Sequence, residues 1–144
     1  SNIFDTESPM PFREKSAWVM AAIIAVTAAL YAALVAPLGG RVPPLIVVVL
    51  SVIVLAVLSV FGQIAIALLA PRDAGAPADE RDRRIADRAG HLSGVVLAAG
   101  IVIAMGMYLV GHPGSHMFHA AFFSLIAAQM TEYVLQIWYY RRGL

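Results

Sequence analysis

The sequence predicts an all-α fold, a four-helix transmembrane bundle. Most of its 144 residues lie in four long apolar stretches, residues 17–36, 45–70, 91–111 and 117–139. A helix needs about 20 apolar residues to cross a hydrocarbon core of about 30 Å, and each stretch has that length. The composition agrees, because 60% of the residues are hydrophobic and only 13% are charged. We therefore expect a single integral membrane domain over residues 1–144, with the lipid bilayer as its main partner.

The distribution of positive charge predicts the orientation of the spans. Lys and Arg near span ends concentrate on the cytoplasmic side of a membrane. Of the ten Lys and Arg residues, only Arg41 lies in the connection between the first two spans, and the turn between the last two has none. Trp18, Trp138, Tyr139 and Tyr140 fall at the predicted cytoplasmic interface, where aromatic rings are favoured. We predict an N-in, C-in protein with both termini cytoplasmic.

The first two spans have clear boundaries. Span 17–36 is rich in alanine, which lets helix backbones approach closely in lipid, and Pro37 with the glycines after it ends the helix. Pro43 and Pro44 open the second span, in a first turn where a missing N–H costs nothing. The Val, Ile and Leu run of span 45–70 would favour a strand in water. In lipid every backbone group must be satisfied internally, so we predict a helix.

A charged cytoplasmic segment, residues 71–90, precedes the third span. It opens with a Pro/Gly/Ala linker, and acids and bases then alternate. Asp79 is a favourable N-cap, and Glu80 and Asp82 suit the positive end of a helix dipole. We predict a cytoplasmic helical extension that starts near Asp79 and continues into span three. The short turn at 112–115 makes spans three and four an antiparallel pair.

The charged residues of this extension form a candidate docking surface. Four acids and four bases balance one another, which argues against direct nucleic-acid binding, since that needs a net basic patch. The segment is either a solvated helix that fixes orientation or a docking surface for a soluble cytoplasmic protein. The residues concerned are Asp79, Glu80, Arg81, Asp82, Arg83, Arg84, Asp87 and Arg88.

Glu132 is the one acid inside the predicted spans. A charge at the bilayer centre costs about 3 kcal/mol or more, so such a group faces the bundle or a cavity. The spacing along the fourth span and the depth of neighbouring polar residues predict an intramembrane polar cluster of Glu132, Gln129, Gln136, Gln63 and His91. Two interpretations remain open: hydrogen bonds that hold the helices together, or a protonation or ion-coupling site.

Three histidines near the outer turn, His112, His116 and His119, could hold zinc or copper. No carboxylate or thiol lies near them in sequence, and the chain has no cysteine. A haem held by two histidines would need a pair at one depth on different helices, and His91 has no histidine partner on its side. We expect no cofactor. Gly-rich phosphate loops, HExxH and a nucleophile elbow are also absent from the sequence, which predicts a non-enzymatic protein.

Four short motifs carry a resemblance to a known group. They are Phe12–Trp18 (FREKSAW), Ala78–Asp82 (ADERD), Glu132–Val134 (EYV) and Tyr140–Arg142 (YRR). With these motifs the chain resembles a group of small bacterial inner-membrane proteins that have four predicted spans and an Asp-Glu-Arg-Asp motif before the third. The resemblance implies a bacterial inner membrane. It also implies a soluble partner, because such proteins are often encoded beside small helix-turn-helix regulators. It carries no catalytic residues.

Three functional hypotheses follow. The leading one is a non-enzymatic sensor or membrane tether that acts through cytoplasmic protein contacts at the docking surface. The alternative is a small proton- or ion-linked transporter or channel that uses Glu132. Four short spans enclose little space, so its pore would form between copies of a homo-oligomer. The third hypothesis is haem or metal binding through the outer histidines.

Overall fold

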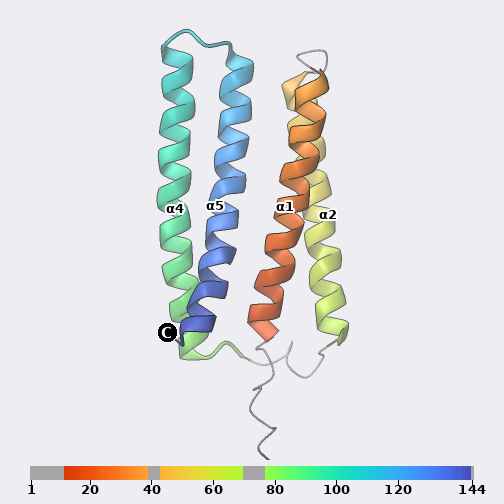
Figure 1. Cartoon of the computed structure of the whole chain (residues 1–144), viewed down its shortest axis with the longest axis vertical. Helices are drawn as coiled ribbons and strands as arrows, with labels where there is room; N and C mark the ends of the chain where they lie inside the picture. The colour runs from red at the N-terminus through yellow and green to blue at the C-terminus, as the bar shows by residue number, and fades with distance from the viewer. Residues whose placement is uncertain (1–11, 39–42, 70–76, 144) are drawn as a thin grey trace, which may run out of the picture.

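The structure is a computed structural model that describes residues 12–38, 43–69 and 77–143. These residues form four helices, α1 (Phe12–Leu38), α2 (Pro44–Leu69), α4 (Glu80–Leu109) and α5 (Gly114–Arg142), and no strand (Figure 1). All four are long and apolar enough to cross a membrane. The predicted all-α fold with four spanning helices is confirmed. Arg41 and residues 71–76 of the predicted linker lie outside the described residues.

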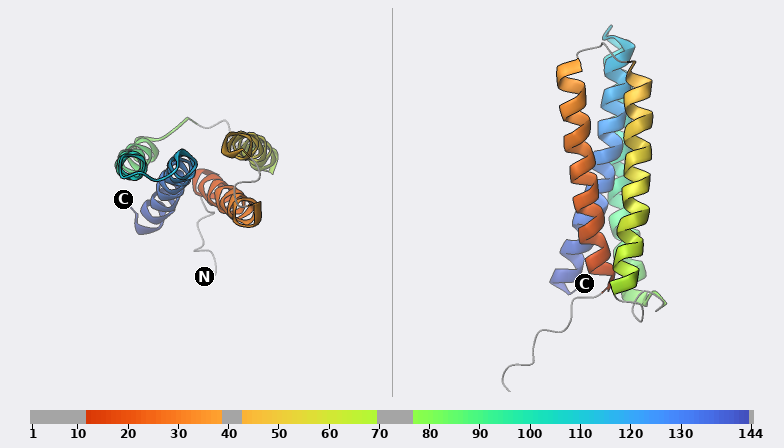
Figure 2. Two further views of the ribbon diagram at one scale, coloured as in Figure 1. Left: turned by 90° about the horizontal axis from the view of Figure 1, so that it is seen from above. Right: turned by 90° about the vertical axis from the view of Figure 1, so that its right-hand side faces the viewer.

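The helices form two antiparallel hairpins that meet through α1 and α5. The α4 and α5 helices pack on each other most extensively, and α1 contacts both α2 and α5. The contact between α2 and α5 is much smaller. Seen from above, α5 and α1 therefore lie in the middle, with α4 and α2 at the two outer positions (Figure 2).

The ends of α4 follow local sequence signals. Asp79 is its N-cap and accepts a hydrogen bond from the Glu80 N–H at 2.7 Å, and Asp82 completes a capping box. From there α4 runs unbroken through the predicted third span, so the predicted helical extension and the span are one helix. At its other end Gly111 has a φ of 90°, which favours glycine. The N–H groups of Gly111 and His112 bond back to Tyr108 and Met107, as in a Schellman motif.

An aromatic cluster joins the two hairpins. The Tyr31 side chain of α1 is completely buried, and its ring centroid lies 4.4 Å from that of Phe122 and 5.3 Å from that of Phe123, both on α5. Ile24 and Ile126 extend this core along the same two helices. Without a hydrophobic driving force between helices in lipid, such van der Waals packing is a main source of helix association.

Within the second hairpin, a glycine sets the closeness of the helices. A Cβ added at Gly100 of α4 would lie 2.4 Å from the Ser124 Cβ of α5. Only a residue without a side chain allows this approach.

The two ends of the bundle differ in chemistry. Figure 1 shows one end of the bundle where α1 and α4 begin and α5 finishes. We call it the charged end, because the ion pairs Arg13–Asp82 and Arg141–Glu14 lie there. The opposite end, with the α4–α5 turn and its histidines, is the turn end.

Candidate functional site at the charged end

Asp82 connects three helices at the charged end. One carboxylate oxygen, Oδ2, accepts from the Asp79 N–H at 3.2 Å and lies 3.1 Å from Nε of Arg13 on α1. The other, Oδ1, accepts a hydrogen bond of 2.7 Å from the Tyr140 hydroxyl of α5. The carboxylate thus serves as a cap for α4 and as a link to both α1 and α5.

A second link joins α1 to α5 beside the first. Nε of Arg141 lies 3.4 Å from Oε1 of Glu14, whose side chain is largely buried. The Arg141 guanidinium also stands 5.3 Å from the centre of the Trp18 ring, a cation–π contact. Glu14 lies in the first turn of α1 and Arg141 in the last turn of α5, so each charge also suits the dipole of its helix.

Arg81 ties the start of α4 to the end of α5. Its Nη2 donates to the Tyr140 carbonyl oxygen at 3.2 Å, one of the carbonyls that a helix C-terminus leaves without an internal partner. The arginines of the Arg13–Asp82 and Arg141–Glu14 pairs are about half exposed or more, and ion pairs that water screens in this way contribute about 0–1 kcal/mol each. These contacts therefore fix the register of three helix ends more than they add stability.

The predicted docking surface divides into two parts. Asp79, Arg81 and Asp82 are used in capping and in contacts within the bundle. Five other side chains are exposed, and Glu80 and Arg84 form an i,i+4 pair with 3.2 Å between Oε1 and Nε. The three that make no hydrogen bond or ion pair among the described residues are Arg83, Asp87 and Arg88.

The predicted intramembrane cluster is likewise divided. Glu132 of α5 accepts two hydrogen bonds, one from Gln136 Nε2 at 3.3 Å and a longer one from Ser93 Oγ of α4 at 3.5 Å. Gln63 of α2 instead pairs with Ser16 of α1, where its Nε2 donates to Ser16 Oγ at 2.9 Å. His91 is exposed. No single hydrogen-bonded cluster of all five residues forms among the described residues.

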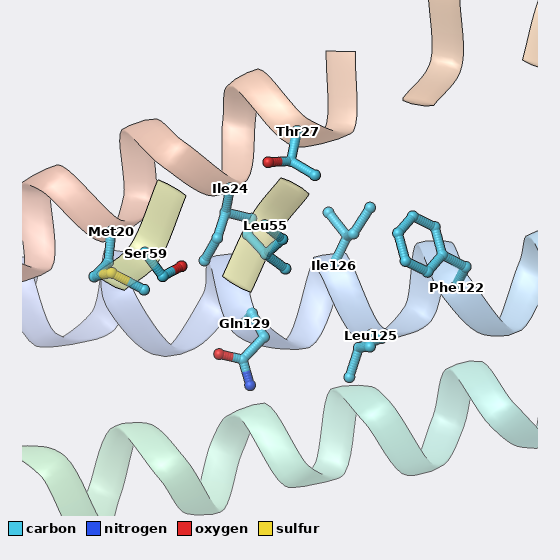
Figure 3. A pocket seen from close by; sticks show the side chains of 9 residues that line it. All are labelled: Met20, Ile24, Thr27, Leu55, Ser59, Phe122, Leu125, Ile126 and Gln129. Atoms are coloured by element: carbon cyan, nitrogen blue, oxygen red, sulfur yellow. The ribbon is translucent and has the colours of Figure 1, made fainter. Parts of the chain in front are cut away.

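Gln129, the fifth member, borders a cavity of about 210 Å³ between α1, α2 and α5 (Figure 3). The lining is mostly apolar, with Ile24, Leu55 and Phe122 among the side chains drawn. Thr27 also lines it, but its hydroxyl donates to the Ile23 carbonyl of its own helix. The cavity therefore has few polar groups available to a charged solute.

The outer histidines do not converge. His119 forms a hydrogen bond through Nδ1 with the Tyr31 hydroxyl. His112 Nδ1 lies 3.2 Å from the Met107 carbonyl oxygen, and the His112 and His116 ring centroids are 6.2 Å apart. Within the described ranges no group of three His, Cys, Asp or Glu side chains is placed to hold a metal ion. The predicted three-histidine site is therefore not formed there.

Sequence reasoning did not single out three of the residues that make these contacts. Ser16 and Tyr31 each have a polar group close to or within an apolar span, and such groups usually find an interhelical partner. Arg13 belongs to the FREKSAW motif and to the positive charges that predict orientation, and neither pattern indicates its contact with Asp82. A polar side chain at the depth of a complementary one on another span is the signal that could have found them.

The fold and these contacts define an integral membrane protein with four spanning helices that are tied together at one end by charged side chains. The chain belongs to the family described as predicted membrane protein (DUF2178), which it matches over residues 13–144. This confirms the resemblance to a membrane protein family of unknown biochemical function, and no enzymatic family is indicated. Neither the curated proteins nor the solved structures gave a match.

Proposed function

We propose that the protein is a membrane tether or sensor that binds a soluble cytoplasmic protein through the outward face of the first turns of α4. The observation that carries this proposal is the division of the charged segment. Arg81 and Asp82 hold the helix end against α5, while Arg83 and Asp87 are exposed and make no polar contact with the described bundle. Charges that a fold does not use are available to a partner.

The proposal requires that the charged end face the cytoplasm of a bacterial cell. The positive-inside distribution supports this, since nine of the ten Lys and Arg residues lie outside the first connection. Because the chain has no cysteine, single cysteines can report the orientation. In right-side-out vesicles, an impermeant maleimide should label His112→Cys at the turn end and spare Gly143→Cys at the charged end. The opposite pattern would overturn the orientation and the proposal with it.

The binding test exchanges charges without changing their sum. The double variant Arg83→Glu/Asp87→Lys reverses an i,i+4 pair and keeps the net charge constant. We expect it to lose tenfold or more in capture of a helix-turn-helix regulator, the class of soluble partner that the resemblance implies. The matched control is Arg142→Gln, which changes an exposed residue of α5 at the same charged end of the bundle and should bind the regulator as the parent does. Unchanged capture by the double variant, with normal membrane insertion, would refute the proposal.

Proton- or ion-linked transport through Glu132 is the second candidate. In its favour, Glu132 is an acid at span depth beside polar Gln136 and Ser93. Against it, both neighbours already bond to the carboxylate, as expected for interhelical glue, and the nearby cavity is mostly apolar. Transport by the purified protein in vesicles that is lost in Glu132→Gln would favour this candidate. Absence of transport in the parent protein would leave the hydrogen-bonding role.

A further inference from the structure

We propose that a basic groove between α4 and α5 at the charged end binds the phosphate headgroup of an anionic phospholipid from the surrounding bilayer. The groove is a cavity of about 160 Å³ lined by Arg84, Ile85, Arg88 and Tyr139. It combines cationic donors, a hydroxyl and an apolar wall in one place. This goes beyond the proposed protein contact, which uses Arg83 and Asp87.

The two arginines of the groove are available to an anion. They are one helical turn apart and share a face, where like charges disfavour each other. An anion between them would remove that cost. Arg88 makes no hydrogen bond or ion pair in the part of the chain that the structure describes. Arg84 pairs only with Glu80, and both side chains are about two-thirds exposed or more, so that pair is weak. A guanidinium also matches the oxygens of a phosphate in a bidentate manner.

Tyr139 adds a hydroxyl donor to the two arginines of the groove. The residue is only 9% exposed, and its ring packs against Trp138. Its hydroxyl makes no hydrogen bond among the described residues and reaches the surface, because none of their buried side-chain polar atoms lacks a partner. Because the side chain lines the groove, its accessible hydroxyl can donate to a phosphate oxygen that the arginines hold.

The position of the groove identifies the source of the phosphate as a lipid. Below Arg88 on the same side of α4, His91 is exposed, and then the exposed apolar side chains of Leu92 and Val95 follow. A phospholipid has this order of chemistry, with an anionic headgroup above apolar chains. Basic pockets at the cytoplasmic ends of spanning helices attract anionic lipids in this way. A soluble phosphate would gain nothing from Leu92 and Val95.

The test measures lipid retention by the full chain. Delipidated protein in detergent micelles is titrated with phosphatidylglycerol or phosphatidylcholine, and bound lipid is counted by native mass spectrometry. We expect at least tenfold tighter binding of the anionic lipid. That preference should be lost in Arg84→Gln/Arg88→Gln and weakened about threefold in Tyr139→Phe, which keeps the ring. The control Arg83→Gln, one position away but on the outward face, should bind the anionic lipid as tightly as the parent does.

Several outcomes would overturn the lipid site. They are equal binding of the two lipids, an unchanged preference in the double variant, or competition by inorganic phosphate at the concentration of the lipid. If the double variant lost helicity, Tyr139→Phe alone would decide. If Arg84→Gln/Arg88→Gln abolished capture of the regulator but kept lipid retention, the groove would belong to the protein contact instead. Failure of Arg83→Glu/Asp87→Lys to affect capture would refute the proposed function and leave the lipid site intact.

Discussion

The α4/α5 hairpin and the α1/α2 hairpin are built from similar lengths of apolar helix but pack differently. The α4/α5 pair makes the most extensive helix contact and has a close approach at Gly100. Its turn is closed by backbone hydrogen bonds to Tyr108 and Met107. The α1/α2 pair packs over a smaller area, and the one side-chain hydrogen-bond pair between its described parts joins Ser16 and Gln63. A mostly apolar cavity lies where this pair meets α5.

Hydropathy therefore does not decide which helices touch in a bilayer. The most apolar of the four helices is α2, yet apart from α1 it has only a small contact with α5. Its large side chains such as Phe61 and Leu68 are exposed, as suits a surface that faces lipid. By contrast, α4 is close to α5 because glycine and serine allow it. Lipid solvates large apolar side chains as well as a neighbouring helix does, so small and polar residues select the contacts.

The variant Tyr31→Ala tests the junction between the hairpins, and we expect it to lower stability most. Tyr31→Ala removes a completely buried ring from the aromatic cluster, together with its hydrogen bond to His119. Truncation of buried aromatic residues costs about 3–5 kcal/mol. We expect the free energy of unfolding to fall by an amount of that order. It is measured by titration with sodium dodecyl sulfate in mixed micelles, with circular dichroism as the signal.

Tyr108→Ala is the matched control, because Tyr108 is an exposed tyrosine on α4. Its effect should stay within about 0.5 kcal/mol, as for surface substitutions in general. Equal effects of the two variants would mean that the aromatic cluster does not join the hairpins.

The next effect tests the close approach of α4 and α5. Gly100→Ala would place a methyl group against Ser124, whose Cβ cannot rotate away, so the helices must separate. Overpacking of this kind costs about 1–3 kcal/mol. Gly106→Ala is the control, since nothing lies within 4 Å of the added Cβ, and alanine favours helix. In the same unfolding assay, Gly100→Ala should have a clearly lower free energy of unfolding than Gly106→Ala. The reversed order would show that this contact does not hold the hairpin together.

The sequence predicted the fold better than the site, for a physical reason. Span number, the start of α4 near Asp79 and a short turn around Pro113 depend on length, caps and breakers, which are local in sequence. Which spans touch depends on small residues on the sides that face each other. One helix carries several small residues, and the sequence does not show which of them lies at a contact. In the predicted cluster around Glu132, Gln129 and Gln136 follow from helical spacing, but Gln63 and His91 follow from depth alone. Depth does not fix the angular position, so Gln63 pairs with Ser16, and His91 is exposed.

The docking surface shows the same limit. Its eight residues share a segment, but a helix points them in all directions, and only the partner helix decides which of them are used. Arg13 and Tyr140, which bind Asp82, come from the beginning and the end of the described chain. No local pattern could have shown that these residues meet.

A smaller effect tests whether the charged end aligns the two hairpins. Asp82→Ala removes a capping carboxylate and its contacts with Arg13 and Tyr140. A lost cap costs about 1 kcal/mol, and exposed ion pairs add little. We expect a decrease of that size in the unfolding assay. Asp87→Ala, five residues along the same helix and without a polar contact among the described residues, should change stability by a few tenths of a kcal/mol at most. Equal losses would argue against Asp82 as a link.

Double-mutant cycles compare the polar links of the two hairpins directly, and their coupling free energies should be small. Interhelical hydrogen bonds in membranes average about 0.6 kcal/mol, because the separated helices also find partners. A double-mutant cycle of Ser16→Ala and Gln63→Leu should therefore give a coupling near that value, since the two side chains exchange two hydrogen bonds of 3.0 and 2.9 Å. Ser93→Ala with Glu132→Gln should give a weaker coupling, because their contact is 3.5 Å long and Ser93 also donates to Gly90. If the second coupling proved the larger, the α4/α5 hairpin would owe its tighter packing to Glu132, and not only to its small residues.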